Sequence, residues 1–201
     1  MSLPVKRLSL FSRPTKRGFS LIELLLTLGV IAILLVAAFV IYPKVRLSQQ
    51  INQEKANLSA LQAGIRSMLA GQGGNYSVLG AVGETRGNRF ANQARVVPIT
   101  MNGGDYEGST ITNGWNGAVV LHSTVGSFEG YQAGRSFGIQ YNGIPTEACV
   151  DFFTRTIGGF SAAWINGSTG AGTYLTPQSD VALVAQRCQL QSPATIHFVS
   201  N

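Results

Sequence analysis

The chain has 201 residues, of which 45% are apolar and only 12% carry a charge, and its formal net charge is +6. Soluble domains contain about 25% charged residues, so this composition indicates a long apolar segment beside one modest domain. Five of the 15 bases lie in the first 18 residues, which contain no acid. The other ten bases face nine acids, which excludes the strongly basic surface of a nucleic-acid-binding protein.

Residues 1–18 are predicted to form a disordered, basic leader peptide. The segment contains two prolines, Pro4 and Pro14, and the five bases Lys6, Arg7, Arg13, Lys16 and Arg17. Lysine and arginine next to an apolar segment favour the cytoplasmic side of a membrane. We therefore expect the leader to stay in the cytoplasm.

Residues 19–42 are predicted to form a transmembrane helix. This stretch is almost entirely apolar, with one acid and no base. At 1.5 Å per residue it extends about 36 Å, which exceeds the roughly 30 Å hydrocarbon core of a bilayer. Buried helices of soluble proteins are seldom so long and so apolar on every side.

Residues 43–72 are predicted to continue the same helix as an amphipathic segment. Apolar side chains recur every three, four or seven residues: Leu47, Ile51, Leu58, Leu61, Ile65 and Met68. Polar side chains, among them Glu54 and Asn57, are expected on the other faces. Pro43 could kink the junction because it removes one backbone donor. Gly71, Gly73 and Gly74 predict the end of the helix.

Residues 73–201 are predicted to form a globular α+β head. Turn dipeptides such as Asn116-Gly117 and Asn142-Gly143 flank runs rich in strand-forming residues. The expected strands are residues 95–101, 117–122, 136–141 and 195–200. Short helices are expected at 145–153, with Pro145 at the start, and at 179–187, capped by Ser179 or Asp180. The expected core includes Trp115, Phe152, Phe153, Phe160 and Trp164, the last being the most exposed of the five.

The two cysteines, Cys149 and Cys188, fit a disulfide if the head is exported. Neither belongs to a Cys-x-x-Cys pair or lies near a histidine at metal-ligand spacing. Exported proteins fold in oxidising compartments, where thiols pair. The alternative is two unrelated buried thiols.

One motif carries the functional information: Lys16-Arg17-Gly18-Phe19-Ser20-Leu21-Ile22-Glu23. A basic leader ends in glycine, an aromatic residue follows, and a lone carboxylate lies four residues further on. The motif resembles the processing signal of type IV prepilins. The resemblance implies that prepilin peptidase cleaves between Gly18 and Phe19 and that Phe19 is then N-methylated. A glycine suits a protease site because its backbone can be approached closely.

Glu23 needs an explanation because a carboxylate in hydrocarbon costs about 2.5–3.5 kcal/mol on insertion scales. The resemblance implies that Glu23 pairs with the amino terminus of Phe19 on a neighbouring subunit during assembly. Alternatively, Glu23 could reach the lipid headgroups on its own. Two other interpretations of the whole segment are a removable secretory signal, for which it is long, and an ordinary single-span anchor.

A second, looser resemblance concerns the C-terminal half. Ile144-Pro145 followed by Cys149, and Cys188 ahead of a last strand, resemble type IVb pilins of the PilS type. This implies a pilin roll: a long N-terminal helix, apolar and protruding in its first half, packed on an antiparallel sheet with one disulfide. The Phe19 at the mature start is instead typical of type IVa pilins.

We therefore expect the structural subunit of a type IVb pilus, not an enzyme, that polymerises with itself for adhesion, aggregation or conjugative mating. The implied partners are prepilin peptidase, the inner-membrane assembly platform with its ATPase, the inner membrane, and a host or recipient cell surface. The head would lie in the periplasm before assembly and outside the cell afterwards. The alternatives are a minor pilin or a type II secretion pseudopilin, and, less favoured, a membrane-tethered enzyme.

No cofactor or metal is expected from the sequence. It contains no phosphate-binding loop, dinucleotide fingerprint or calcium loop. His122 and His197 have no acid placed by sequence to complete a catalytic triad, so both are expected to be structural or surface residues.

Overall fold

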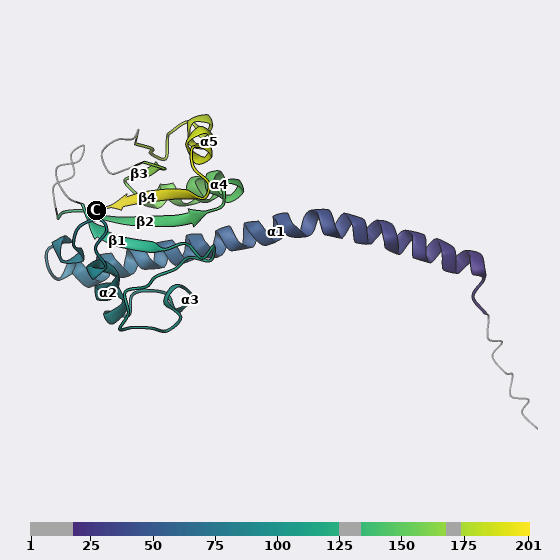
Figure 1. The fold of residues 1–201 in the computed structure, drawn as a ribbon, viewed down its shortest axis with the longest axis horizontal. Helices are drawn as coiled ribbons and strands as arrows, with labels where there is room; N and C mark the ends of the chain where they lie inside the picture. Colours follow the sequence, from purple (N-terminus) through teal and green to yellow (C-terminus); the bar gives the residue numbers. More distant parts are fainter. Residues whose placement is uncertain (1–17, 125–133, 168–173) are drawn as a thin grey trace, which may run out of the picture. The chain divides into compact units, whose positions relative to one another are not determined.

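The computed structural model describes residues 18–124, 134–167 and 174–201 (Figure 1). The predicted leader lies outside the described residues except for Gly18. The chain divides into two units, Met1–Lys44 and Val45–Asn201. The first holds the apolar helix, and the second holds all the described strands and the remaining helices.

Helix α1 extends over Leu21–Ala70 and includes Pro43 without a break in the helical assignment. The backbone N–H of Leu24 donates to the carbonyl of Ser20 (3.1 Å), which closes the first turn. Beyond Ala70 the chain turns through Gly73 and Gly74, whose φ angles of 69° and 68° suit glycine. The predicted long helix and its glycine-rich end are both confirmed.

The part of α1 within the second unit packs one face into the head. Its fully buried apolar side chains follow the helical period: Ile51, Leu58, Leu61, Ile65 and Leu69. The expectation that Glu54 and Asn57 lie on polar faces is wrong, because they are only 2% and 5% exposed. Residue 54 lies three positions after Ile51 and four before Leu58, and this spacing puts it on the buried face.

The sheet has the strand order β1-β2-β4-β3, with every neighbouring pair antiparallel (Figure 1). The strands are β1 (Val119–Ser123), β2 (Phe137–Ile144), β3 (Ala162–Ile165) and β4 (Ala194–Ser200). Three of them match predicted strands at 117–122, 136–141 and 195–200. Strand β3 was missed, since only four residues pair there.

The predicted strand at 95–101 is wrong. Helix α2 (Arg86–Gln93) ends just before it, and Arg95 has a left-handed φ of 57°. Pro98 cannot donate to a strand ladder, and α3 (Ile99–Asn102) starts directly after it. Val97 and Met101 are buried in the core, so their apolar character reflects packing rather than a strand.

The inner face of the sheet and two short helices complete the core. Tyr141 and Phe198 lie on this face, and Phe152 from α4 (Thr146–Thr156) packs against both, with ring centroids 5.4 and 6.0 Å away. Helix α5 (Val181–Gln189) is capped by Asp180, whose side chain accepts from the N–H of Ala182. Two 3₁₀ turns, η1 (Ser77–Leu79) and η2 (Ile157–Gly159), join the elements.

The expected aromatic core is largely confirmed. Phe152, Phe153 and Phe160 are buried, and Trp115 is partly buried against them. The expectation for Trp164 is wrong, because its side chain is 4% exposed and stacks on His197. The long N-terminal helix, antiparallel sheet and disulfide confirm the predicted fold class.

Candidate functional site

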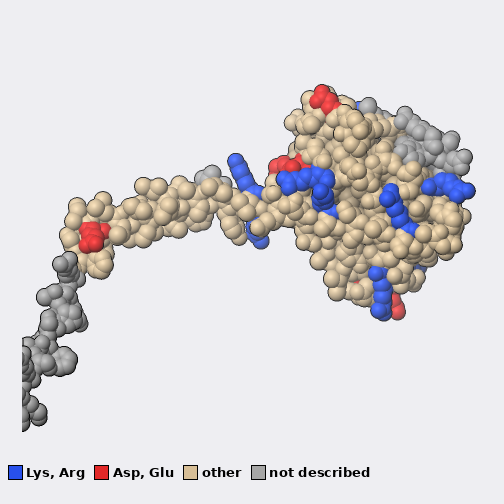
Figure 2. All heavy atoms as spheres, turned by 180° about the vertical axis from the view of Figure 1, so that it is seen from behind, with Lys and Arg blue, Asp and Glu red and all other residues tan. Residues whose placement is uncertain are grey.

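The first part of α1 presents apolar side chains on every side. The large apolar side chains described between Phe19 and Tyr42 are 51–81% exposed. This helix is long and apolar enough to cross a membrane, with a mean hydropathy of 3.1 over its most apolar stretch. Figure 2 shows the stretch almost free of charged side chains. Such a surface requires lipid or other apolar helices around it.

Glu23 is the only charged residue from Gly18 to Pro43. It lies in the first turn of α1, where the helix dipole favours a negative charge by about 0.3–1 kcal/mol. Phe19, two residues ahead of the helix, is 81% exposed. Gly18, Phe19 and Glu23 therefore lie together at the start of α1, with the carboxylate about one turn from Phe19 along the chain.

The fold does not require a glycine at position 18. A methyl group added at its Cα would meet no atom of the described residues within 4 Å, and its φ lies outside the left-handed region. Other glycines in the head are required by packing; a side chain at Gly87, for example, would collide with the carbonyl of Leu121. A requirement for glycine at position 18 would therefore come from a partner of the chain rather than from its own structure.

A buried polar network joins α1 to the sheet. The hydroxyl of Tyr141 donates to Glu54 Oε2 (2.8 Å), and Asn57 Nδ2 donates to Glu54 Oε1 (3.1 Å). Thr100 in α3 donates to Asn57 Oδ1 (3.1 Å). Burial and the neighbouring Glu54 carboxylate raise the pKa of Tyr141 well above its usual value, so the phenol stays protonated as the donor. The network fixes the position of α1 along β2.

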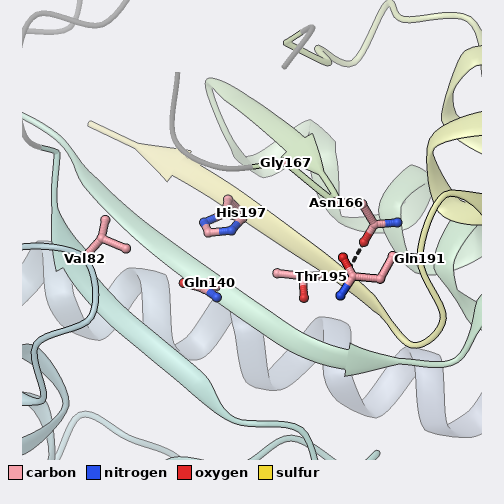
Figure 3. A pocket seen from close by; sticks show the side chains of 7 residues that line it. All are labelled: Val82, Gln140, Asn166, Gly167, Gln191, Thr195 and His197. Atoms are coloured by element: carbon pink, nitrogen blue, oxygen red, sulfur yellow. Dashed lines mark hydrogen bonds between the residues drawn. The ribbon is translucent and has the colours of Figure 1, made fainter. Parts of the chain in front are cut away.

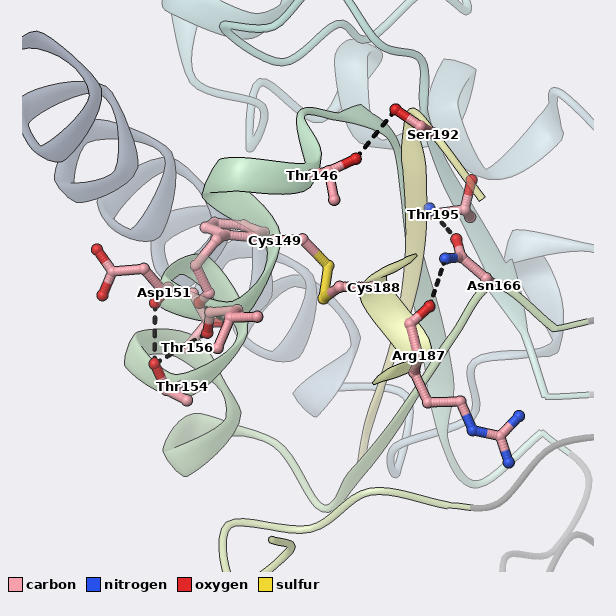
Figure 4. The surroundings of a disulfide bond; sticks show 12 residues. Thr146, Cys149, Asp151, Thr154, Thr156, Asn166, Arg187, Cys188, Ser192 and Thr195 are labelled. Carbon is pink, nitrogen blue, oxygen red and sulfur yellow. Dashed lines mark hydrogen bonds between the residues drawn. A yellow bond between two sulfur atoms is a disulfide. The ribbon is translucent and has the colours of Figure 1, made fainter. Parts of the chain in front are cut away.

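The disulfide joins Cys149 in α4 to Cys188 in α5 (Figure 4). Its Cα atoms are 5.9 Å apart, and both side chains are buried. Beside it, Asn166 Nδ2 donates to the carbonyl of Arg187 (2.8 Å) and Asn166 Oδ1 accepts from the N–H of Thr195 (2.7 Å). These contacts hold α5 against the start of β4.

The predicted site residues fall into two places. Gly18, Phe19 and Glu23 lie in the first unit, and the cysteine pair lies in the second. Within the described residues, no three histidine, cysteine or acidic side chains form a metal-binding group. His122 and His197 are both buried, and their rings lie near each other. The proximity of the two rings could not be predicted from the sequence, because it depends on the order of the strands in the sheet.

Comparison with protein families gives two matches. Residues 48–201 match the family described as PilS N terminal. Residues 13–39 match the prokaryotic N-terminal methylation motif. The first match covers the head and the second half of α1. The second covers the segment that contains Gly18, Phe19 and Glu23.

Solved structures of type IV pilins share the fold. The type IVb pilin of Salmonella typhi has 21% sequence identity and a TM-score of 0.54, over 75% of this chain and 99% of that one. TcpA, a type IV pilin of the Vibrio cholerae El Tor biotype, has 14% identity and a TM-score of 0.51, over 76% and 99%. No curated protein matches the chain.

Proposed function

Because the chain belongs to the PilS family and is a subunit of a type IV pilus, we propose that it is the major subunit that forms the shaft of a type IVb filament. It serves as a structural protein and needs no enzymatic activity for this role. It is made with a leader, stored in the inner membrane, processed, and then polymerised with copies of itself.

In this proposal prepilin peptidase cleaves between Gly18 and Phe19 and methylates the new amino group. Residues 1–18 are the leader, 19–42 the membrane and polymerisation segment, 43–72 the amphipathic continuation, and 73–201 the head. The match to the methylation motif spans the proposed cleavage site. The methylation-motif match over residues 13–39 supports the modification of Phe19.

The observation that carries the proposal is the single carboxylate of Glu23 within an exposed apolar helix. Lys44 is the first base after Gly18, more than five helical turns from Glu23, so α1 offers Glu23 no intrahelical ion pair. Cleavage before Phe19 would create a cation one turn from Glu23. A charge pair buried among apolar helices specifies register, because only one axial offset leaves neither charge unpaired.

The pairing most useful for assembly is between Glu23 of one subunit and the Phe19 amine of the next. Transfer of α1 from lipid to a bundle of like helices removes no apolar surface from water, since lipid tails are as apolar as leucine. The hydrophobic effect therefore does not drive extraction from the membrane. Extraction therefore needs another driving force. The charge pair provides specific docking, and the assembly ATPase on its inner-membrane platform provides the energy.

The head, residues 73–201, would lie in the periplasm before assembly and on the filament surface afterwards. Its disulfide suits an oxidising compartment. There the head would contact a host or recipient cell, for adhesion, aggregation or conjugative mating.

The direct test is Glu23→Ala beside Glu23→Gln in the native producer. Both variants should be cleaved and remain in the membrane, with the amount of sheared filament falling at least about tenfold, since an unpaired buried charge costs several kcal/mol. Filament yield is measured by weighing the sheared fraction and by electron microscopy. Normal filament yield from either variant would contradict the pairing.

A matched control is Thr27→Ala, one turn further along α1. Among the described residues, the Thr27 hydroxyl donates only to the carbonyl of Leu24 on its own helix (2.9 Å), so its loss should leave assembly near normal. In the purified fibres this chain should account for most of the protein mass. A trace amount beside a different dominant subunit would make it a minor pilin.

A further inference from the structure

The only two histidines of the chain meet on the outer face of the sheet, away from α1. His122 lies on β1 and His197 on β4, with β2 between them. In the strand register, His122 is opposite Gly138 and His197 is opposite Gln140. The two ring centroids are only 6.4 Å apart, although β1 and β4 are not adjacent in the sheet.

Gly138 makes this approach possible. A side chain at position 138 would collide with the ring atoms Cε1 and Nε2 of His122. The imidazole of His122 therefore lies over the bare backbone of β2. On the other side, the ring of His197 stacks on Trp164 of β3, with centroids 4.9 Å apart and an interplanar angle of 11°. Both rings are held in place, and both are at least 95% buried.

Both rings bear a buried nitrogen without a hydrogen-bond partner in the described part of the chain: Nε2 of His122 and Nδ1 of His197. Nδ1 of His122 lies 3.1 Å from the carbonyl of Ser123. A carbonyl only accepts, so Nδ1 carries the proton and Nε2 presents a lone pair. A histidine held this way, with one nitrogen bonded to the backbone and the other bare, has the orientation of a metal ligand.

We propose that His122 Nε2 and His197 Nδ1 together bind one divalent transition-metal ion of the kind that prefers imidazole, such as Zn²⁺ or Cu²⁺. Metal–nitrogen bonds of about 2.0–2.1 Å to both rings would hold their centroids about 4.5–6.5 Å apart, depending on the angle at the ion. The observed 6.4 Å is the value for a nearly linear arrangement, so a tetrahedral ion, which holds the centroids about 5.2 Å apart, draws the rings together by about 1 Å.

His197 also lines a pocket of about 370 Å³, together with Gln140, Thr195 and Gln191 (Figure 3). Gln140 Nε2 donates to Asn142 Oδ1 (2.8 Å), which fixes the amide and leaves its oxygen as an acceptor toward the pocket. The pocket provides a path for the ion and space for water ligands. With two protein nitrogens, the site binds moderately and favours imidazole-preferring ions over Mg²⁺ or Ca²⁺.

Burial favours the unprotonated form of both imidazoles. Burial lowers the pKa of His122, and burial with the neighbouring His122 lowers that of His197 to about 4. Both imidazoles are therefore neutral near pH 7, as a metal ligand must be. The two cysteines form a disulfide and offer no thiolate to compete for the ion.

Electron paramagnetic resonance of the full chain in detergent micelles, loaded with one equivalent of Cu²⁺ at pH 7.5, tests the proposal without any substitution. The expected spectrum shows coupling to two imidazole nitrogens, and these can only belong to His122 and His197. Coupling to one imidazole or to none would overturn the shared site.

Titration calorimetry with Zn²⁺ adds a matched pair of variants. His197→Phe keeps an aromatic ring on Trp164 and should weaken Zn²⁺ binding by about tenfold or more. Gln191→Ala, at the exposed rim of the pocket, should bind Zn²⁺ with the affinity of the original chain. Mg²⁺ should not bind to the original chain or to Gln191→Ala. Equal Zn²⁺ affinity in His197→Phe and the original chain would contradict the proposal. If His197→Phe does not fold, the Cu²⁺ spectrum decides alone.

Discussion

The two halves of helix α1 differ in where their partners are found. From Leu21 to Lys44, large apolar side chains cover every side of the helix and remain exposed. From Val45 to Ala70, one face is buried in the head and the others are polar. Both halves have helical backbone, so the difference comes entirely from the side-chain pattern.

This contrast shows how one helix serves two purposes. The second half has an apolar stripe, which one sheet can cover, and the chain supplies that sheet. The first half has no polar side, so only a surrounding medium of lipid or like helices can cover it. Substitutions in the first half should therefore alter processing and assembly, and substitutions in the second unit should alter the stability of the head.

The largest effect is expected from Gly18→Leu. The substitution disturbs no contact among the described residues, since none of their atoms lies within 4 Å of a Cβ at this position. Leader removal should nonetheless be lost, and the intact mass of the membrane protein should keep the first 18 residues. Gly29→Ala is the matched control, because Gly29 is also free of neighbours in the structure. It should be processed normally, and equal processing of Gly18→Leu would refute the cleavage site.

In the second unit, loss of the disulfide should have the largest effect. Cys149 and Cys188 close a loop of 39 residues, whose restriction in the unfolded chain contributes about 4 kcal/mol to the free energy of unfolding. Cys149→Ser with Cys188→Ser should lower that free energy by this order in urea titrations. Leader cleavage should be unchanged; a block in cleavage would mean that the two units do not act separately.

Acid should destabilise the head through its two histidines. In the unfolded chain an imidazole has a pKa of 6.5, while that of His197 in the fold is lowered to about 4. Between these values the unfolded state binds more protons, so stability falls as the pH drops from 6.5 to 4, by about 3 kcal/mol. Urea titrations with a chelator present measure this. In His197→Phe, the free energy of unfolding should depend less on pH between 6.5 and 5. An unchanged slope would argue against the lowered pKa of His197.

A smaller loss is expected from Tyr141→Phe. The substitution removes the donor to Glu54 Oε2 and leaves a buried carboxylate short of one hydrogen bond, at a cost of about 2 kcal/mol. Tyr106→Phe is the control, since Tyr106 is partly exposed and its contact with Arg95 is made by the ring face, over which Arg95 lies, and not by the hydroxyl. The unfolding free energies of the two variants should differ by this amount. Equal values would mean that the Glu54 network does not stabilise the head.

The parts of the fold that follow a simple period could be predicted from the sequence. Helix α1, its end beyond Ala70, and three strands with turn dipeptides beside them all follow local rules. Strand β3 has only four residues, too few for a pattern. The segment at 95–101 looked like a strand because of Val96 and Val97, but Pro98 and the packing of Met101 override that preference.

The buried polar groups mark the limit of sequence reasoning. Glu54 could have been placed by its spacing from Ile51 and Leu58, but its charge suggested a solvent-facing position. The strands of His122 and His197 lie on either side of β2. Their rings approach each other across β2 because Gly138 has no side chain in the way. Such contacts depend on strand order and on one absent side chain, and neither has a local signature in a single sequence.

The central claim is that Glu23 obtains its counter-ion only after the chain is cut beside it. Intact-mass measurement and N-terminal sequencing of filaments sheared from the cell surface test it most directly. The account predicts a subunit that begins with N-methylated Phe19 and makes up most of the fibre. Fibres whose subunit retains Met1, or a processed chain found only as a monomer in the membrane, would contradict it.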